Sequence, residues 1–250
     1  MSHLSIPVQE AALFLDLDGT LAAIAERPED VVAEPYRTGL IRNIDRALRG
    51  RLAIVSGRPI DDIDRILDNA VKYVAGIHGL ERRGPSGIFE SAEPHPQLDR
   101  VHSILASFVK HRPALHLEYK ALGVALHYRQ APQAAAEVLN VARRLAWATG
   151  LKLQEGRMVV ELRTPGADKG DTVRDFMKAP PFCKTTPIFV GDDVTDEDGF
   201  AAARELGGIG VLVGSWRDTK ASARLHSVEE VLAWLDAALA TGSFELDVQI

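Results

Sequence analysis

The sequence predicts an α/β protein with a parallel sheet covered by helices on both faces, into which a smaller α+β domain is inserted. Apolar, strand-like runs alternate with helix-like segments over residues 1–81 and again over 166–250, which is typical of a parallel sheet. Residues 82–165 instead carry period-two alternation on both sides of one helical segment, which indicates a separate α+β domain.

The first segment, residues 1–81, contains the start of the expected sheet. Its apolar runs are short enough for buried strands, and the segments between them have helical spacing. We expect, in order, a strand over 11–17, a helix around 36–49, a strand over 51–55, a helix around 59–68 and an apolar segment over 73–79.

The middle segment, residues 82–165, is bounded by turn-rich sequences at 82–85 and 164–166, which are plausible hinges. Residues 116–120 and 124–129 alternate with period two and are expected to be strands, as is 158–162. The alanine- and leucine-rich stretch 131–147 is expected to be a helix.

The last segment, residues 166–250, resumes the alternation of the first. We expect a helix opening at Lys169, a strand over 187–190, a helix over 197–206, a strand over 209–213 and a helix over 227–240. The last helix is amphipathic, and its aliphatic residues are expected to pack into the core: Val228, Val231, Leu232, Leu235 and Leu239.

Length and composition narrow the possible classes of protein. A chain of 250 residues with 46% hydrophobic content is expected to form one or two folded domains, and no apolar run approaches the length of a membrane span. The N-terminus lacks the pattern of a secretion signal, and the single cysteine, Cys183, excludes an internal disulfide framework. We therefore expect a cytoplasmic monomer that binds neither membranes nor nucleic acids.

Charge is unevenly distributed along the chain. Residues 82–165 contain 12 Lys and Arg against seven Asp and Glu, a net charge of +5, so the remainder carries −11. An acidic remainder that holds a cation and a basic segment 82–165 would suit a phosphorylated small molecule bound between them. Chance surface charge explains the distribution equally well when it is taken alone.

The hexapeptide 16–21, Asp-Leu-Asp-Gly-Thr-Leu, directly follows the apolar run 11–15. Parallel sheets place their chemistry at the carboxyl ends of strands, and a pair of carboxylates there can supply both a nucleophile and a proton carrier. An ordinary Asp-Gly turn after a buried strand is the alternative interpretation.

The hexapeptide resembles the first motif of the haloacid dehalogenase (HAD) phosphatases, and three further stretches match that family's motifs in order. They are the strand ending at Ser56-Gly57-Arg58, the helix opening at Lys169 and the strand ending at Gly191-Asp192-Asp193. The resemblance implies a HAD-like Rossmannoid core, and an insertion between the second motif and the lysine implies a C2-type cap.

The resemblance also implies a set of catalytic residues. Asp16 would be the nucleophile that forms an aspartyl-phosphate, and Asp18 the general acid and base. Ser56, Lys169 and the hydroxyl of Thr20 would hold phosphate oxygens. A Mg²⁺ cofactor would be bound by Asp16, the backbone carbonyl of Asp18 and Asp192, with Asp193 and Asp196 supporting these ligands from behind.

Within HAD phosphatases, the chain resembles the trehalose-6-phosphate phosphatases, which implies hydrolysis of that phosphosugar in trehalose biosynthesis. The match covers residues 191–197, 56–58, 76–79, 118–120 and 126–129, together with Glu161. The residues then expected to bind substrate are Thr20, Gly57, Arg58, His78, Glu118, Lys120, His127, Arg129 and Glu161. Polar residues on a two-sided strand pair can also simply face water. Another C2-capped sugar phosphatase or phosphomutase, for sucrose 6-phosphate or a hexose phosphate, is the nearest alternative, and a catalytically silent phosphosugar-binding regulator is a more distant one.

Overall fold

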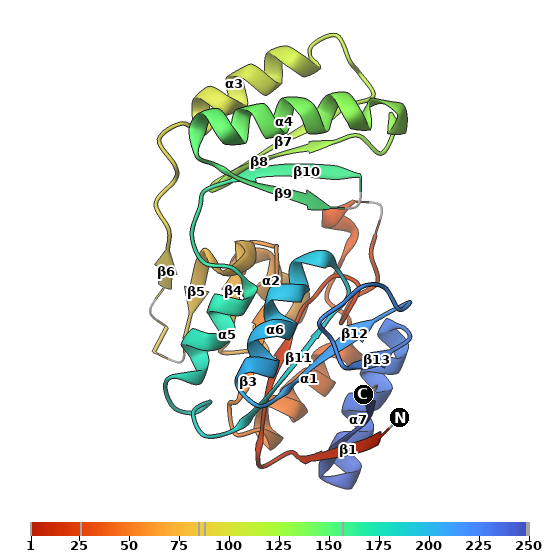
Figure 1. Cartoon of the computed structure of the whole chain (residues 1–250). Coiled ribbons are helices and arrows are strands. Elements are labelled where there is room, and N and C mark those ends of the chain that lie inside the picture. Colours follow the sequence, from red (N-terminus) through yellow and green to blue (C-terminus); the bar gives the residue numbers. More distant parts are fainter. Residues whose placement is uncertain (1, 26, 85, 88, 157, 249–250) are drawn as a thin grey trace. The chain divides into compact units, whose positions relative to one another are not determined.

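The computed structural model describes residues 2–25, 27–84, 86, 87, 89–156 and 158–248. The chain forms two compact units, Met1–Glu90 with Ala167–Ile250, and Ser91–Gly166 (Figure 1). None of the described helices is long and apolar enough to span a bilayer.

The first unit is built on one mixed sheet, which contains ten strands among the described residues. The strands β13, β12, β11, β2, β3 and β4 run parallel. The strand β14 pairs antiparallel with β13 and β1, and β5 pairs antiparallel with β4. In order across the sheet, the strands are β1 (Ser2–Pro7), β14 (Ser243–Val248), β13 (Ala223–Leu225), β12 (Ile209–Val213), β11 (Thr186–Gly191), β2 (Ala11–Leu15), β3 (Leu52–Val55), β4 (Tyr73–Gly76), β5 (Glu81–Arg83) and β6 (Phe89–Ser91).

Helices pack on both faces of this sheet, so its central strands are buried on both sides. In β2, Leu13 and Leu15 face one apolar core, and Ala12 and Phe14 face the other. Such double burial explains why these strands read as unbroken apolar runs in the sequence. The first core includes residues of α1 (Pro35–Ala47), α2 (Ile60–Leu67) and α7 (Val228–Thr241), and the second includes residues of α5 (Lys169–Met177) and α6 (Glu197–Glu205). The predicted fold class is therefore confirmed.

The boundary of the first unit lies at Glu90, later than the position after residue 81 that the sequence suggested. The reason is that β5 pairs with β4 and β6 follows it in the sheet order, so both extend the large sheet. Neither strand is apolar enough to be recognised from periodicity, since β5 consists of Glu81, Arg82 and Arg83.

The second unit is an antiparallel sheet packed with two helices. The strand order is β7 (His116–Lys120), β8 (Gly123–His127), β10 (Val159–Arg163) and β9 (Lys152–Gly156), and the helices are α3 (Leu98–Val109) and α4 (Ala135–Thr149). Leu105 of α3 and Val138 of α4 belong to the same buried cluster as Val124 and Leu126 of β8. The helix α3 and the strand β9 were not expected from the sequence.

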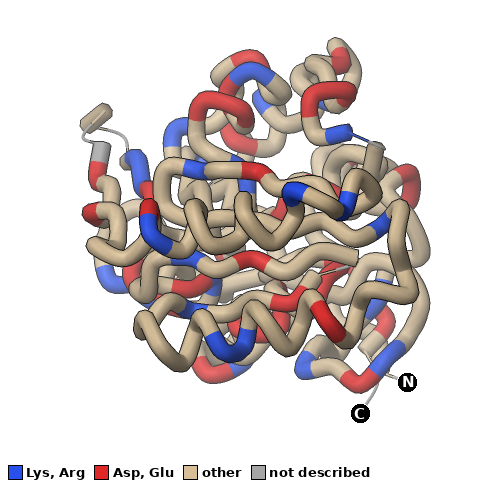
Figure 2. The backbone as a smooth tube through the Cα atoms, turned by 90° about the horizontal axis from the view of Figure 1, so that it is seen from above, with Lys and Arg blue, Asp and Glu red and all other residues tan. Residues whose placement is uncertain are grey.

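Positively and negatively charged residues are interspersed along the backbone (Figure 2). Many of their side chains interact. Several form ion pairs within the first unit, including Arg83 with Asp64, and Arg82 with Asp175 at 2.7 Å. Solvent-exposed pairs, such as Arg42 with Asp68, contribute only about 0–1 kcal/mol each, so the buried charges described next matter more for the chemistry.

Candidate active site

Two neighbouring strands bring acidic side chains to one edge of the large sheet. Asp16 follows β2 and Asp192 follows β11, and these parallel strands are paired up to Val190 opposite Leu15. The backbone N–H of Asp16 donates to the carbonyl of Val190 at 3.0 Å, which continues the pairing to the point where the strands end. The two carboxylates therefore lie close together because the sheet register places them there.

Gly19 allows this close approach. It has a φ of +76°, and a Cβ atom at this position would lie 2.2 Å from Oδ2 of Asp192. Any side chain here would be strained by its backbone conformation and would also displace the Asp192 carboxylate. The glycine is thus required by both the turn after β2 and the acidic side chain that follows β11.

Lys169 is a buried cation at the start of α5. Its Nζ lies 3.1 Å from Oδ1 of Asp16 and 2.6 Å from Oδ1 of Asp196, and its side chain is 2% exposed. The helix start is fixed by a capping box, in which the side chain of Asp168 accepts from the N–H of Asp171 at 2.9 Å. A capped helix end thus delivers the lysine into the acidic cluster.

Asp196 anchors the turn after β11. Its Oδ2 accepts from the backbone N–H groups of Asp192 at 3.0 Å and Asp193 at 2.9 Å, while its Oδ1 binds Lys169. Carboxylate oxygens of Asp16, Asp192 and Asp196 all lie within 4.8 Å of one another. Because both oxygens of Asp196 are already engaged, Asp16 and Asp192 are better placed to bind a cation.

The cluster contains three carboxylates and a single ammonium group, that of Lys169, so its negative charge is not fully balanced. Burial, together with the charges of Asp196 and Asp192, raises the pKa of Asp16 well above its ordinary value, although Lys169 opposes this shift. Burial and the neighbours Asp196 and Asp193 raise the pKa of Asp192 to about 7. Burial opposes the charge of Lys169, but Asp16 and Asp196 raise its pKa above the ordinary value. A second, hard cation with oxygen preference fits this donor set.

Asp18 is not among the carboxylates of the acidic cluster. The guanidinium of Arg58 donates two hydrogen bonds to the carboxylate of Asp18, from Nε to Oδ2 at 2.6 Å and from Nη2 to Oδ1 at 2.8 Å. The remaining nitrogen of Arg58, Nη1, donates to the carbonyl of Pro28 at 2.8 Å. Arg58, which the sequence suggested as a substrate ligand, therefore contacts the expected general acid in this structure.

The loop after β3 holds the predicted residues Ser56 and Gly57. The hydroxyl of Ser56 accepts from the N–H of Arg58 at 3.2 Å, and the carbonyl of Ser56 accepts from the N–H of His78 at 2.9 Å. A Cβ on Gly57 would lie 2.7 Å from atoms of the His78 ring, so the glycine makes room for the imidazole. Gly57 and His78 are thus packed against each other.

The hydroxyl of Thr20, in the turn after β2, lacks a hydrogen-bond partner among the described residues. This hydroxyl is fully buried. Buried polar atoms are normally paired, and an exception in a native protein calls for an explanation. An oxygen of a bound ligand would satisfy this hydroxyl.

In the second unit, four predicted residues form two adjacent ion pairs across one sheet. Nε2 of His127 lies 2.9 Å from Oε2 of Glu118, and Nζ of Lys120 lies 2.8 Å from Oε2 of Glu161. The hydrogen bond from His127 lowers the pKa of Glu118. Glu118 and Glu161 lie opposite the same residue of β8, Ala125, so their side chains share one face.

This face also has an unmet acceptor. Oε1 of Glu161 is buried and has no hydrogen-bond partner among the described residues. Gly123 leaves room for it, since a Cβ there would lie 2.8 Å from that oxygen. Arg129 lies beyond the end of β8 and is exposed. His116, which sequence analysis did not select, has its ring 5.7 Å from that of His127 and is a further candidate on this face.

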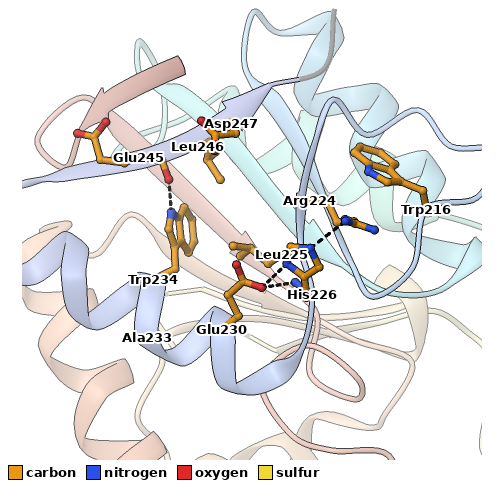
Figure 3. Close-up of a pocket in the computed structure, with 10 residues that line it drawn as sticks. All are labelled: Trp216, Arg224, Leu225, His226, Glu230, Ala233, Trp234, Glu245, Leu246 and Asp247. Carbon is orange, nitrogen blue, oxygen red and sulfur yellow. Dashed lines mark hydrogen bonds and ion pairs between the residues drawn. The ribbon is translucent and has the colours of Figure 1, made fainter. Parts of the chain in front are cut away.

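A separate hollow of about 550 Å³ lies in the first unit, lined by residues from β13, α7 and β14 (Figure 3). Three of its polar groups interact in series: Nη2 of Arg224 lies 2.8 Å from Nε2 of His226, whose Nδ1 lies 2.7 Å from Glu230. None of the predicted site residues lines it. The acidic cluster is therefore the stronger candidate for chemistry.

This chain is similar to known proteins over most of its length. The family model described as trehalose-phosphatase matches residues 14–229. The trehalose-6-phosphate phosphatase of Escherichia coli K12 is 38% identical over 232 residues, covering 90% of this chain and 85% of the relative. A probable trehalose-phosphate phosphatase of Sinorhizobium fredii is 36% identical, covering 96% and 91%.

Solved structures extend the similarity to the fold. The crystal structure of a trehalose-6-phosphate phosphatase related protein has 27% identity and a TM-score of 0.73, with 92% of this chain and 97% of that chain covered. The C-terminal domain of the Candida albicans trehalose-6-phosphate phosphatase has 20% identity and a TM-score of 0.81, with 93% and 92% covered. The second similarity concerns the fold alone.

Proposed function

This chain belongs to the trehalose-phosphatase family, and we propose that it hydrolyses trehalose 6-phosphate to trehalose and phosphate. Membership makes it a HAD-type phosphatase and a phosphoric monoester hydrolase. The observation that carries the proposal is the buried cluster in which Lys169 pairs with Asp16, next to Asp192.

Asp16 is the proposed nucleophile. One of its carboxylate oxygens would attack phosphorus, and the bond from phosphorus to the sugar oxygen would break, which leaves an aspartyl-phosphate. The contact with Lys169 supports this role, because a neighbouring cation favours the ionised carboxylate that the attack requires. The buried position also excludes water that would otherwise solvate the nucleophile.

Asp18 is the proposed proton carrier. It would give a proton to the departing sugar oxygen, then take one from the water that attacks the aspartyl-phosphate and releases phosphate and Asp16. The two hydrogen bonds from Arg58 to the carboxylate oxygens of Asp18 support the ionised form that the second step needs. For the first step, Asp18 must receive a proton and turn toward the leaving oxygen.

The acidic cluster fits a divalent cation, and we propose Mg²⁺. Asp16, Asp192 and the backbone carbonyl of Asp18 would supply ligand oxygens, while Asp193 and Asp196 support the turn. The raised pKa of Asp192 supports the assignment, since it reflects burial together with neighbouring negative charge that one lysine does not balance. When bound, the cation would offset charge on the phosphate and on Asp16.

Residues around the cluster would bind the phosphate oxygens. The unpartnered hydroxyl of Thr20 supports a role as donor, as does the position of Ser56 in the loop after β3. Lys169 would contribute its charge to the same group. Gly57, Arg58 and His78 would shape the loop that surrounds the phosphate.

The second unit would recognise the sugar. Glu118, Lys120, His127 and Glu161 form a charged set of donors and acceptors on one sheet face, and the free oxygen of Glu161 can accept a sugar hydroxyl. Arg129 is proposed as a further contact. Each hydroxyl of a neutral disaccharide can both donate and accept a hydrogen bond, so it can pair with either type of group on such a face.

The proposed function is tested by phosphate release from trehalose 6-phosphate, sucrose 6-phosphate, glucose 6-phosphate and an aryl phosphate, each with Mg²⁺ or EDTA. We expect kcat/KM for trehalose 6-phosphate to exceed that for each other phosphosugar by on the order of 100-fold, because a hydrogen-bonding site discriminates strongly. EDTA should abolish turnover. Equal rates across the panel would refute the substrate, and full activity in EDTA would refute the metal.

The role of the second unit is tested by Glu118→Ala and Lys120→Ala. Each removes one partner of an ion pair on the proposed sugar face, so we expect a loss of about 10- to 100-fold in kcat/KM for trehalose 6-phosphate. Turnover of the aryl phosphate should change by less than about threefold, because it lacks the sugar.

Matched controls for these variants are Glu155→Ala, from the exposed pair with Arg143, and Lys110→Ala, which is exposed. Both controls belong to the same unit and should leave both activities at the wild-type level. Equal losses on the two substrates in the Glu118 and Lys120 variants would indicate that these residues support the fold and not recognition.

A further inference from the structure

The turn that carries Asp192 and Asp193 is held from a second side by a segment distant in the sequence. Nη2 of Arg217 donates to the backbone carbonyl of Asp193 at 2.8 Å. Arg217 also forms an ion pair with Glu197, the first residue of α6. The turn is therefore fixed by Asp196 through its N–H groups and by Arg217 through a carbonyl.

Glu197 gathers three donors from this segment. Its Oε1 accepts from the hydroxyl of Thr219 at 2.9 Å as well as from Arg217, and its Oε2 accepts from the N–H of Lys220 at 2.7 Å. Its side chain is 15% exposed, and the bonds from Arg217 and Thr219 are partly buried, whereas the bond from Lys220 is exposed. Charge-assisted hydrogen bonds of this kind are about twice as strong as neutral ones.

The turn needs such support because its acidic side chain lies among like charges. Asp192 is close to both Asp16 and Asp196, and this repulsion favours any movement of the turn that separates the carboxylates. Fixing the carbonyl of Asp193 opposes that movement. The side chains of Glu197 and Arg217 do this without joining the carboxylate cluster that would bind the cation.

We propose that Glu197 and Arg217 are positioning residues that preset the Asp192 turn for binding a divalent cation. The inference rests on the proposed function, since it concerns the same metal site. Residues that orient metal ligands from behind typically change metal affinity about 10- to 100-fold when they are mutated. We expect mutation of either residue to lower the affinity for the divalent cation by this amount.

The test is a titration of the unfolding temperature with Mg²⁺ at pH 7.5, on the full chain. A ligand that binds only the folded state raises this temperature with concentration according to its affinity. Glu197→Gln and Arg217→Met are expected to raise the Mg²⁺ concentration needed for a given increase by about tenfold. Arg217→Lys keeps the charge but loses the forked geometry, so it should have an intermediate effect.

Arg174 and Glu205 provide matched controls. They form an ion pair with an N–O distance of 2.8 Å between α5 and α6, away from the turn. Glu205→Gln and Arg174→Met should lower the metal-free unfolding temperature slightly and leave the Mg²⁺ dependence unchanged. This comparison separates a loss of stability from a loss of metal affinity.

Wild-type Mg²⁺ dependence in the Glu197→Gln and Arg217→Met variants would overturn the inference, whatever their metal-free stability. Should Arg217→Met not fold, Arg217→Lys decides the question alone, because an unchanged Mg²⁺ dependence in it contradicts the proposal. A wild-type chain that shows no Mg²⁺ dependence would contradict the metal site of the proposed function as well as the inference.

Discussion

Replacement of Asp16 by Asn is expected to reduce phosphate release from trehalose 6-phosphate by at least about 10⁴-fold, the scale seen when a nucleophile is removed. An amide oxygen is a poor nucleophile, so the aspartyl-phosphate cannot form in the usual way. Asn has nearly the shape of Asp, and its carbonyl oxygen can still accept from Lys169, which lies 3.1 Å from Oδ1. The fold should therefore persist.

The measurement is steady-state phosphate release with Mg²⁺, accompanied by circular dichroism and thermal unfolding. Asp61→Asn is the matched control, since this exposed residue of α2 undergoes the same chemical change away from the cluster. It should retain wild-type turnover. Normal hydrolysis by the Asp16→Asn variant would show that another group attacks phosphorus.

In the absence of metal, stability is expected to fall as pH rises from about 4 to 7. The pKa of Asp192 is about 7 in the folded chain and 3.8 ordinarily, so within this window the unfolded state is deprotonated while the folded state still holds its proton. The free energy of unfolding therefore decreases by about 4 kcal/mol for this group across the whole window and levels off above the folded pKa. The raised pKa of Asp16 acts in the same direction.

Added Mg²⁺ should reverse the trend, because it binds the deprotonated carboxylates and stabilises more strongly at higher pH. Urea unfolding at pH 5.5, 6.5 and 7.5, in EDTA and in Mg²⁺, measures both effects. Lys169 stays charged throughout, since its pKa is raised, and it adds no slope in this window. Metal-free stability that increases steadily from pH 5.5 to 7.5 would contradict the expected charge balance.

The central fold was predictable because its strands are buried on both faces and therefore stand out as apolar runs. The parallel register then accounts for the meeting of Asp16 and Asp192, since each directly follows a strand. The edge strands were not recognised for the opposite reason: β1 has mostly exposed or half-exposed residues, and β5 is wholly charged. Such strands are defined by their partners and not by their own pattern.

Contacts between side chains that are distant in the sequence could not be predicted from the sequence alone. Arg58 matched a substrate-binding pattern, yet its guanidinium contacts Asp18, 40 residues earlier. The bond between Arg217 and the carbonyl of Asp193 involves a backbone atom, which leaves no trace in residue types. The position of His116 opposite His127 follows from the register of β7 against β8, which periodicity does not give.

The central place of β2 and β11 in the large sheet has a consequence for dynamics. Each is hydrogen-bonded on both sides, β2 to β11 and β3, and β11 to β2 and β12. Segments in this position open only with the cooperative unfolding of their whole unit, whereas loops and edges open at much lower free energy. The backbone beneath Asp16 and Asp192 is thus among the most rigid in the chain, and conformational adaptation to a ligand falls to the turns beyond the strand ends.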